Sequence, residues 1–188
     1  MARLLVLGDD RTADYHARQL ARALGQESVE RGDRLAGFLA GARAGDGVVP
    51  HPTMPHLLWE WLAERLRARR VPAPRGWGLP FESAGPAGEV YLSAAAWICP
   101  ATCVEPEHCP ILHGPRDWSL ADMIESRARE LGYAPAMFHV LQRAGGVAAV
   151  DAAELLGAAR SLVGRRVLVA TSSHCHAAVG ALEPQLPT

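Results

Sequence analysis

Three cysteines fall within eleven residues, at Cys99, Cys103 and Cys109, and a fourth, Cys175, follows later in the chain. Thiolates are soft donors that bind zinc and iron–sulfur clusters. Cys103 and Cys109 stand among proline, glutamate and histidine, which is a poor setting for buried structural thiols. We therefore expect Cys99, Cys103, Cys109 and Cys175 to bind a metal or a cluster.

The spacing of the cysteines favours an iron–sulfur cluster, with zinc as the alternative. Structural zinc sites commonly have two residues between paired cysteines, whereas three and five residues separate these. Cys99 and Cys109 each precede a proline, as one cysteine does in the common bacterial ferredoxin motif. A 4Fe-4S cluster is the favoured cofactor on these grounds.

Cys175 stands between His174 and His176, after an apolar segment that is typical of a strand. At the start of a helix, Cys175 could act as a cluster ligand or as a nucleophile activated by a neighbouring histidine. Asp9 and Asp10 follow the first predicted strand, where carboxylates bind a cation, transfer protons or cap the next helix. The candidate catalytic residues are His174, His176, Asp9 and Asp10.

The remaining histidines carry weaker signals. His108 and His113 flank the cysteine segment and could be ligands or could support ligands. His51 lies in a proline-rich stretch and could line the same edge of the sheet as the candidate catalytic residues, although histidines in such stretches are more often found in surface loops. His16 falls on the first predicted helix, where we expect it to be solvated or half-buried.

These residues must be positioned by elements that the apolar pattern predicts. The predicted strands are 4–7, 90–98, 137–141 and 166–170, with a strand fragment at 48–49. The predicted helices are 12–24, 34–43, a segment from residue 55 to about 70, 119–131, 151–163 and 173–182. Residues 71–88 and 99–116 are predicted loops.

This order predicts a single α/β domain over 1–188, with an irregular helical and loop insertion at about 25–88. We expect a Rossmann-like three-layer fold with a four- or five-stranded, mainly parallel sheet and a loop rich in cysteine and proline. Ligands of such sheets bind beyond the carboxyl ends of the strands. The sulfur of Cys175 should then lie within ~7 Å of the other three sulfurs, with Asp9 on the same edge.

Composition narrows the function. The net charge of −1 gives no basic surface for nucleic acid, and the chain has no lysine, which excludes a Walker-type phosphate loop and Schiff-base chemistry. Residues 8–15, GDDRTADY, have too few glycines for the usual dinucleotide turn. No apolar run is long enough to span a membrane, so a cytoplasmic location is expected.

Three hypotheses remain open from the sequence. The first is an iron–sulfur protein, an oxidoreductase or lyase, that acts on a small molecule at the edge of the sheet or with a redox partner protein. The second is a non-catalytic binding module stabilised by zinc. The third is a hydrolase or transferase with Cys175 as its nucleophile. A homo-oligomer is compatible with each.

Overall fold

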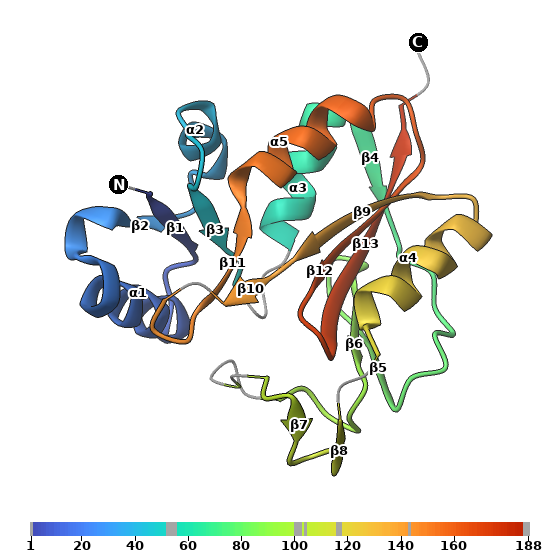
Figure 1. Ribbon diagram of the computed structural model, residues 1–188. Helices are drawn as coiled ribbons and strands as arrows, with labels where there is room; N and C mark the ends of the chain where they lie inside the picture. The colour runs from blue at the N-terminus through green and yellow to red at the C-terminus, as the bar shows by residue number, and fades with distance from the viewer. Residues whose placement is uncertain are drawn as a thin grey trace.

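The computed structural model describes residues 2–51, 56–99, 103, 105–115, 118–142 and 144–185. Two main sheets stand side by side, and helices lie between them (Figure 1). The chain builds part of the first sheet, crosses to the second, returns to the first at residues 141–151 and ends in the second. The two sheets are therefore interleaved in sequence.

The first sheet contains β1 (Leu4–Leu7), β2 (Val29–Gly32), β3 (Gly47–Val49), β10 (Leu141–Gln142) and β11 (Ala148–Asp151). Its strand order is β10-β11-β3-β1-β2. Strand β1 runs parallel to β2 and β3, whereas β11 runs antiparallel to β3. The helical segments joining its first three strands are α1 (Arg11–Leu24), the 3-10 turn η1 (Gln26–Ser28) and α2 (Leu35–Ala40).

The second sheet contains β4 (Ala68–Val71), β5 (Phe81–Ala84), β6 (Val90–Ser93), β9 (Ala134–His139), β12 (Val167–Ser172) and β13 (His176–Pro184). Its order is β5-β6-β13-β12-β9, and β4 also pairs with β13. A small hairpin joins β7 (His108–Cys109) to β8 (Gly114–Pro115). The remaining helices are α3 (His56–Leu66), α4 (Leu120–Glu130) and α5 (Ala152–Ser161).

Alternating side chains on the strands create three hydrophobic cores. In β1, Leu5 and Leu7 join the central core, whereas Leu4 and Val6 face the other side of the sheet, as the period of a strand requires. The central core packs α2, α3 and α5 between the two sheets. Helix α1 covers the outer face of the first sheet, and α4 covers the outer face of the second.

Side-chain caps start three helices where the sequence pattern predicts helices. The carboxylate of Asp10 accepts hydrogen bonds from the backbone N–H groups of Thr12 and Ala13 at the start of α1. Ser119 caps α4, and Asp151 caps α5 in the same manner. Each cap satisfies backbone donors that have no partner inside the helix.

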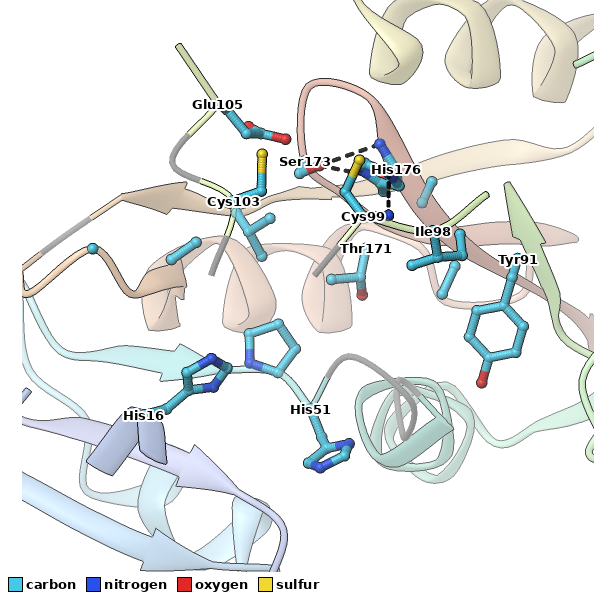
Figure 2. A pocket seen from close by; sticks show the side chains of 16 residues that line it. His16, His51, Tyr91, Ile98, Cys99, Cys103, Glu105, Thr171, Ser173 and His176 are labelled. Atoms are coloured by element: carbon cyan, nitrogen blue, oxygen red, sulfur yellow. Dashed lines mark hydrogen bonds between the residues drawn. The ribbon is translucent and has the colours of Figure 1, made fainter. Parts of the chain in front are cut away.

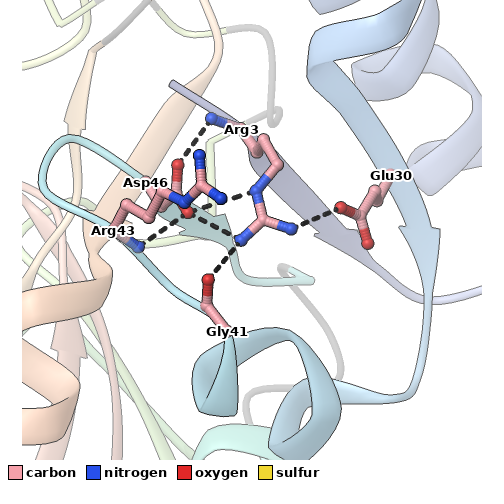
Figure 3. Close-up of polar contacts among 5 residues, drawn as sticks. All are labelled: Arg3, Glu30, Gly41, Arg43 and Asp46. Atoms are coloured by element: carbon pink, nitrogen blue, oxygen red, sulfur yellow. Dashed lines mark hydrogen bonds and ion pairs between the residues drawn. The ribbon is translucent and has the colours of Figure 1, made fainter. Parts of the chain in front are cut away.

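A buried carboxylate ties the start of the chain to the loop before β3 (Figure 3). Asp46, only 1% exposed, accepts hydrogen bonds from the backbone N–H groups of Arg3 and Arg43 and from the guanidinium of Arg3. Arg3 also binds the carbonyl of Gly41 and the carboxylate of Glu30. Burial alone would raise the pKa of Asp46, but these hydrogen bonds outweigh it and hold that pKa below 3.8.

The prediction of an α/β protein is confirmed, whereas the single, mainly parallel Rossmann-like sheet is not what the chain forms. Both main sheets are mixed, because β11 and β13 run antiparallel to their neighbours. The parallel pattern holds locally for β1, β2 and β3 and for the pair β9 and β12.

The predicted helix over 173–182 is wrong: residues 176–184 form β13. This alanine-rich segment has fair helix propensity, but in the fold its alternate residues pack on the two faces of the second sheet. Trp59 lies against Gly180, where an added Cβ would approach the Trp59 ring to 2.7 Å. Trp59 also donates its indole N–H to the carbonyl of Ala181. Tertiary packing thus decides this element.

In residues 66–98, other helix and strand boundaries differ from those that the sequence predicts. Helix α3 ends at Leu66, and Arg69 and Arg70 lie in β4 rather than in the last helical turn. Part of the predicted loop over 71–88 forms β5. The strand predicted over 90–98 ends at Ser93. Residues 94–99 lie outside the strand and connect it to the cysteine segment.

Candidate functional site

The tight turn between β12 and β13 carries the candidate residues His174 and Cys175, and His176 follows as the first residue of β13. The two ends of the turn are joined because Ser173 N–H donates to the carbonyl of His176 at 2.9 Å. The N–H of His176 in turn donates to Ser173 Oγ at 3.2 Å. The turn therefore holds the side chains of Cys175 and His176 at the carboxyl end of β12, where ligands commonly bind in α/β sheets.

Glu105 approaches this turn from the cysteine-rich segment. Its Oε1 accepts a hydrogen bond from the thiol of Cys175 at 3.5 Å, and its Oε2 accepts one from the N–H of His174 at 3.3 Å. The backbone of Glu105 has φ of +49°. This left-handed conformation disfavours residues other than glycine, asparagine and aspartate, and such strain is concentrated at functional sites.

Glu105, Cys175 and His176 form a group with metal-ligand geometry. One oxygen, the sulfur and one ring nitrogen all lie within 4.8 Å of one another. Over the described ranges, which include all four cysteines, this is the one such group of three or more residues. A carboxylate, a thiolate and an imidazole are the three ligand types that zinc accepts.

The electrostatics of this group favour a cation. The Cys175 thiol is buried and donates a hydrogen bond to the Glu105 carboxylate. If the thiol lost that proton with no ion present, two negative charges would be in contact in a site with little water. A divalent cation between the three ligand atoms would replace the proton and remove this repulsion.

A cavity of about 180 Å³ lies beside this group, between the two sheets (Figure 2). One wall comes from the second sheet and the cysteine segment and includes Thr171, Ser173, His176, Cys99, Cys103 and Glu105. The opposite wall comes from the first sheet and includes His16, Pro50, His51, Gly146 and Ala148. The cavity is thus enclosed by segments that are far apart in the sequence.

The predicted four-cysteine ligand set is not formed. Cys109 is buried in the β7–β8 hairpin, where its sulfur accepts a hydrogen bond from the N–H of Leu112. Cys99 and Cys103 line the cavity, and the backbone N–H of Cys99 donates to Nε2 of His176 at 3.0 Å. The hairpin directs Cys109 into local packing, which is why proximity in sequence did not produce a shared site.

The predicted catalytic aspartates lie at the end of β1. Asp10 caps α1, and its Oδ1 also lies 2.8 Å from Nε2 of His51. Its pKa is lowered below 3.8, first by the hydrogen bond from the Ala13 N–H and then by that from His51. The carbonyl of Asp9 accepts a hydrogen bond from Arg31. Neither aspartate lines the cavity, and a catalytic role for each stays a prediction.

Of the two predicted catalytic histidines, only His176 reaches the cavity. The His174 ring packs against Trp118, with the ring centres 5.4 Å apart, and its Nε2 is buried without a hydrogen bond to any of the described residues. His174 instead contributes its backbone N–H to Glu105. Catalysis by either histidine stays a prediction.

The sequence interpretation missed three residues of this site: Glu105, His16 and His51. Glu105 could have been predicted from the sequence, because a carboxylate between cysteines is an ordinary zinc ligand. His16 was assigned to a solvated or half-buried position, and for His51 a surface loop was favoured over the edge of the sheet, but both are buried at the cavity. Their burial depends on the second sheet, which no local pattern reveals.

A family model described as AF_1314_C, "Uncharacterized protein, C-terminal domain", matches residues 54–185. The chain belongs to this family. The matched region contains the whole second sheet and the group Glu105, Cys175 and His176, whereas His16 and His51 precede it. No curated protein and no solved structure matches the chain. Within the described residues, every helix is too short or too polar to cross a membrane.

Proposed function

We propose that this protein is a metal-dependent enzyme that binds one zinc ion through Glu105, Cys175 and His176. The ion would act as a Lewis acid on a small molecule in the adjoining cavity. The observation that carries the proposal is the convergence of an oxygen, a sulfur and a nitrogen ligand within 4.8 Å at the carboxyl end of β12.

The ligand types favour zinc over an iron–sulfur cluster. A cluster of the 4Fe-4S type is normally held by four cysteine thiolates, and Cys109 is engaged inside its own hairpin. Zinc accepts a mixed set of one oxygen, one nitrogen and one sulfur ligand. Among the expected cofactors, zinc therefore has the stronger support.

Three protein ligands favour catalysis over a purely structural role. Structural zinc sites usually have four protein ligands, whereas catalytic sites have three and leave one position for water or substrate. His176 and Glu105 both line the cavity, so an ion bound to them would have a face toward it. The left-handed backbone of Glu105 raises the conformational energy of the folded chain, and a binding function would explain why this conformation is kept.

A bound zinc would supply two kinds of chemistry. It would polarise a carbonyl or similar group, and it would lower the pKa of a bound water to about 7. The protein itself holds the ligands: hydrogen bonds within the β12–β13 turn orient Cys175 and His176. Such support fixes ligand orientation and increases metal affinity.

The cavity limits the substrate to a small molecule with apolar character. Its volume of about 180 Å³ is slightly larger than an engineered cavity of ~150 Å³ that accommodates benzene. Ile98, Val140, Ala177 and Ala178 contribute apolar surface. The substrate class is therefore a compact molecule with one polar group that can bind the metal.

Metal analysis of the purified full chain tests the proposal directly. We expect one zinc per chain, and we expect Glu105→Gln, Cys175→Ser and His176→Gln each to weaken zinc binding by more than the ~10–100-fold typical of supporting residues. Matched controls in the same segment are Glu107→Gln, Cys109→Ser and His108→Gln, which should keep one zinc. Full zinc retention in all three site variants would refute the proposal.

A cysteine nucleophile at residue 175 is the second candidate, favoured by the hydrogen bond from the Cys175 thiol to Glu105. Iodoacetamide separates the two functions. A metal ligand should react only after a chelator removes the ion, whereas an activated nucleophile reacts in the native protein near neutral pH. Rapid labelling of Cys175 with the metal still bound would favour the nucleophile.

A further inference from the structure

We propose that His16, on the wall of the cavity opposite the candidate metal ligands, transfers protons to and from the molecule bound there. The inference rests on the proposed function and extends it to the part of the chain before the family match. It makes the active site bipartite: the second sheet would supply the metal ligands and the first sheet the general acid and base.

His16 has the geometry that this role needs. It lies on α1, its side chain lines the cavity, and it is only 7% exposed. Figure 2 shows its ring on the side of the cavity opposite Cys99 and His176. Its imidazole makes no hydrogen bond to any residue that the structure describes, so its ring nitrogens are not committed to a structural partner there. Its ring nitrogens are therefore available to a molecule in the cavity.

The surroundings of His16 keep it uncharged near neutral pH. Burial lowers its pKa below 6.5, His51 lowers it further, and Asp10 acts in the opposite direction. A neutral imidazole is able to accept a proton, as a general base must. The other ionisable groups that line the cavity are Tyr91, Cys99, Cys103, Glu105, His51 and His176.

His51 and Asp10 form a hydrogen-bonded pair whose charges affect the pKa of His16. His51 is buried, and its Nε2 lies 2.8 Å from Oδ1 of Asp10. In Figure 2 the His51 ring points away from the wall that carries the cysteines. Gly8, with φ of +102°, makes room for it, because a Cβ there would lie 2.8 Å from the His51 ring. The end of β1 is thus shaped around this pair.

In the hydrolysis of an ester, His16 would move one proton from water to the leaving group. His16 takes a proton from water as the water oxygen bonds to the ester carbonyl carbon. The bond from that carbon to the leaving oxygen then breaks, and the leaving oxygen receives the proton from His16. Water and ester become acid and alcohol, and His16 returns to its neutral form, so no other reactant is needed.

The test uses the full chain loaded with zinc and para-nitrophenyl acetate as the probe substrate. We expect His16→Gln to reduce kcat by ~100-fold or more, the usual contribution of a general acid or base, with one zinc still bound. The wild-type rate should fall at acid pH as His16 is protonated, and the part of that fall that His16 causes should be absent in His16→Gln. His108→Gln, a change of an exposed histidine on β7, is the matched control and should keep the wild-type profile.

The outcomes separate this inference from the proposed function. A zinc-loaded His16→Gln protein with the wild-type rate and pH profile would overturn the role of His16, and so would a zinc-loaded wild type that does not hydrolyse the probe. In both cases the metal site would stand. Failure to bind zinc would instead refute the proposed function.

A second variant keeps the inference testable if His16→Gln does not fold. His51→Gln retains a side chain that can donate to Asp10 but removes an imidazole that lowers the pKa of His16. The acid limb of the rate profile should therefore move to higher pH. A limb at the wild-type position in a folded, zinc-loaded His51→Gln protein would contradict the assignment.

Discussion

Two clusters of polar side chains in this protein are built in opposite ways. Around Asp46, a buried carboxylate receives hydrogen bonds from two backbone amides and a guanidinium (Figure 3). Around Glu105, a carboxylate receives one bond from a thiol and one from a backbone amide, and its own backbone is strained. The first carboxylate is paired with Arg3, and the second lies beside groups that can themselves become metal ligands.

The difference supports the proposal that the Asp46 cluster stabilises the fold and that the group of Glu105, Cys175 and His176 binds a metal. A buried anion with a full set of donors and an adjacent cation is in its lowest-energy state without any ligand. A carboxylate, a thiol and an imidazole held together gain most from a cation that all three can share. We therefore assign stability to the Asp46 cluster and binding to the group of Glu105, Cys175 and His176.

The largest expected effect is on stability at Asp46. Replacing Asp46 with Ala removes the acceptor of several hydrogen bonds and should lower the free energy of unfolding by ~2–4 kcal/mol. Glu30→Gln, which affects only an exposed partner of Arg3, should cost less than ~1 kcal/mol. Urea denaturation measures both changes, and equal losses would mean that the buried carboxylate is not the centre of this cluster.

Zinc should stabilise the protein through the other cluster. At a free zinc concentration of 100 times Kd, the free energy of unfolding of the wild type should rise by ~2.7 kcal/mol. Asp46→Ala should show the same increase from its lower starting value, whereas Glu105→Gln should show little increase. Thermal or urea denaturation with and without zinc provides the measurement. A zinc response that Asp46→Ala abolishes and Glu105→Gln keeps would reverse the assignment of the two clusters.

The smallest expected effect is a pH dependence from His16. Its pKa in the folded protein is below 6.5, so the unfolded chain binds the proton first as pH falls. Stability is therefore lost below about pH 6.5, by at most ~1.4 kcal/mol per pH unit from this one group. In metal-free protein, the loss between neutral and mildly acid pH should be smaller in His16→Gln than in the wild type. An identical loss would show that His16 is not shielded from protonation.

Much of the regular structure followed from local pattern. The run Leu4–Leu7 predicted β1, and Asp10 and Gly25 marked the start and end of α1. Helices α4 and α5 were located in the same way. These features depend on side-chain period and on end groups that interact within a few residues, so neighbours in sequence carry the information.

The candidate site was predicted only in part. The sequence singled out the cysteine segment and the turn at residues 174–176, which do lie at one edge of the second sheet. It predicted a helix over residues 173–182, and it predicted that the four cysteines are the metal ligands. The strand β13 and the local hydrogen bond of Cys109 changed both conclusions.

By itself, the sequence determined the types of chemical group available, the positions of most helices and the tight spacing of residues 174–176. Only the tertiary structure decided which groups meet. Trp59 against Gly180 selects a strand for residues 176–184, and that strand brings the turn at Cys175 to Glu105. The packing of two sheets around a shared helical core brings His16 to the same cavity. Such contacts join residues far apart in the chain, and their energies come from burial that no local segment can express alone.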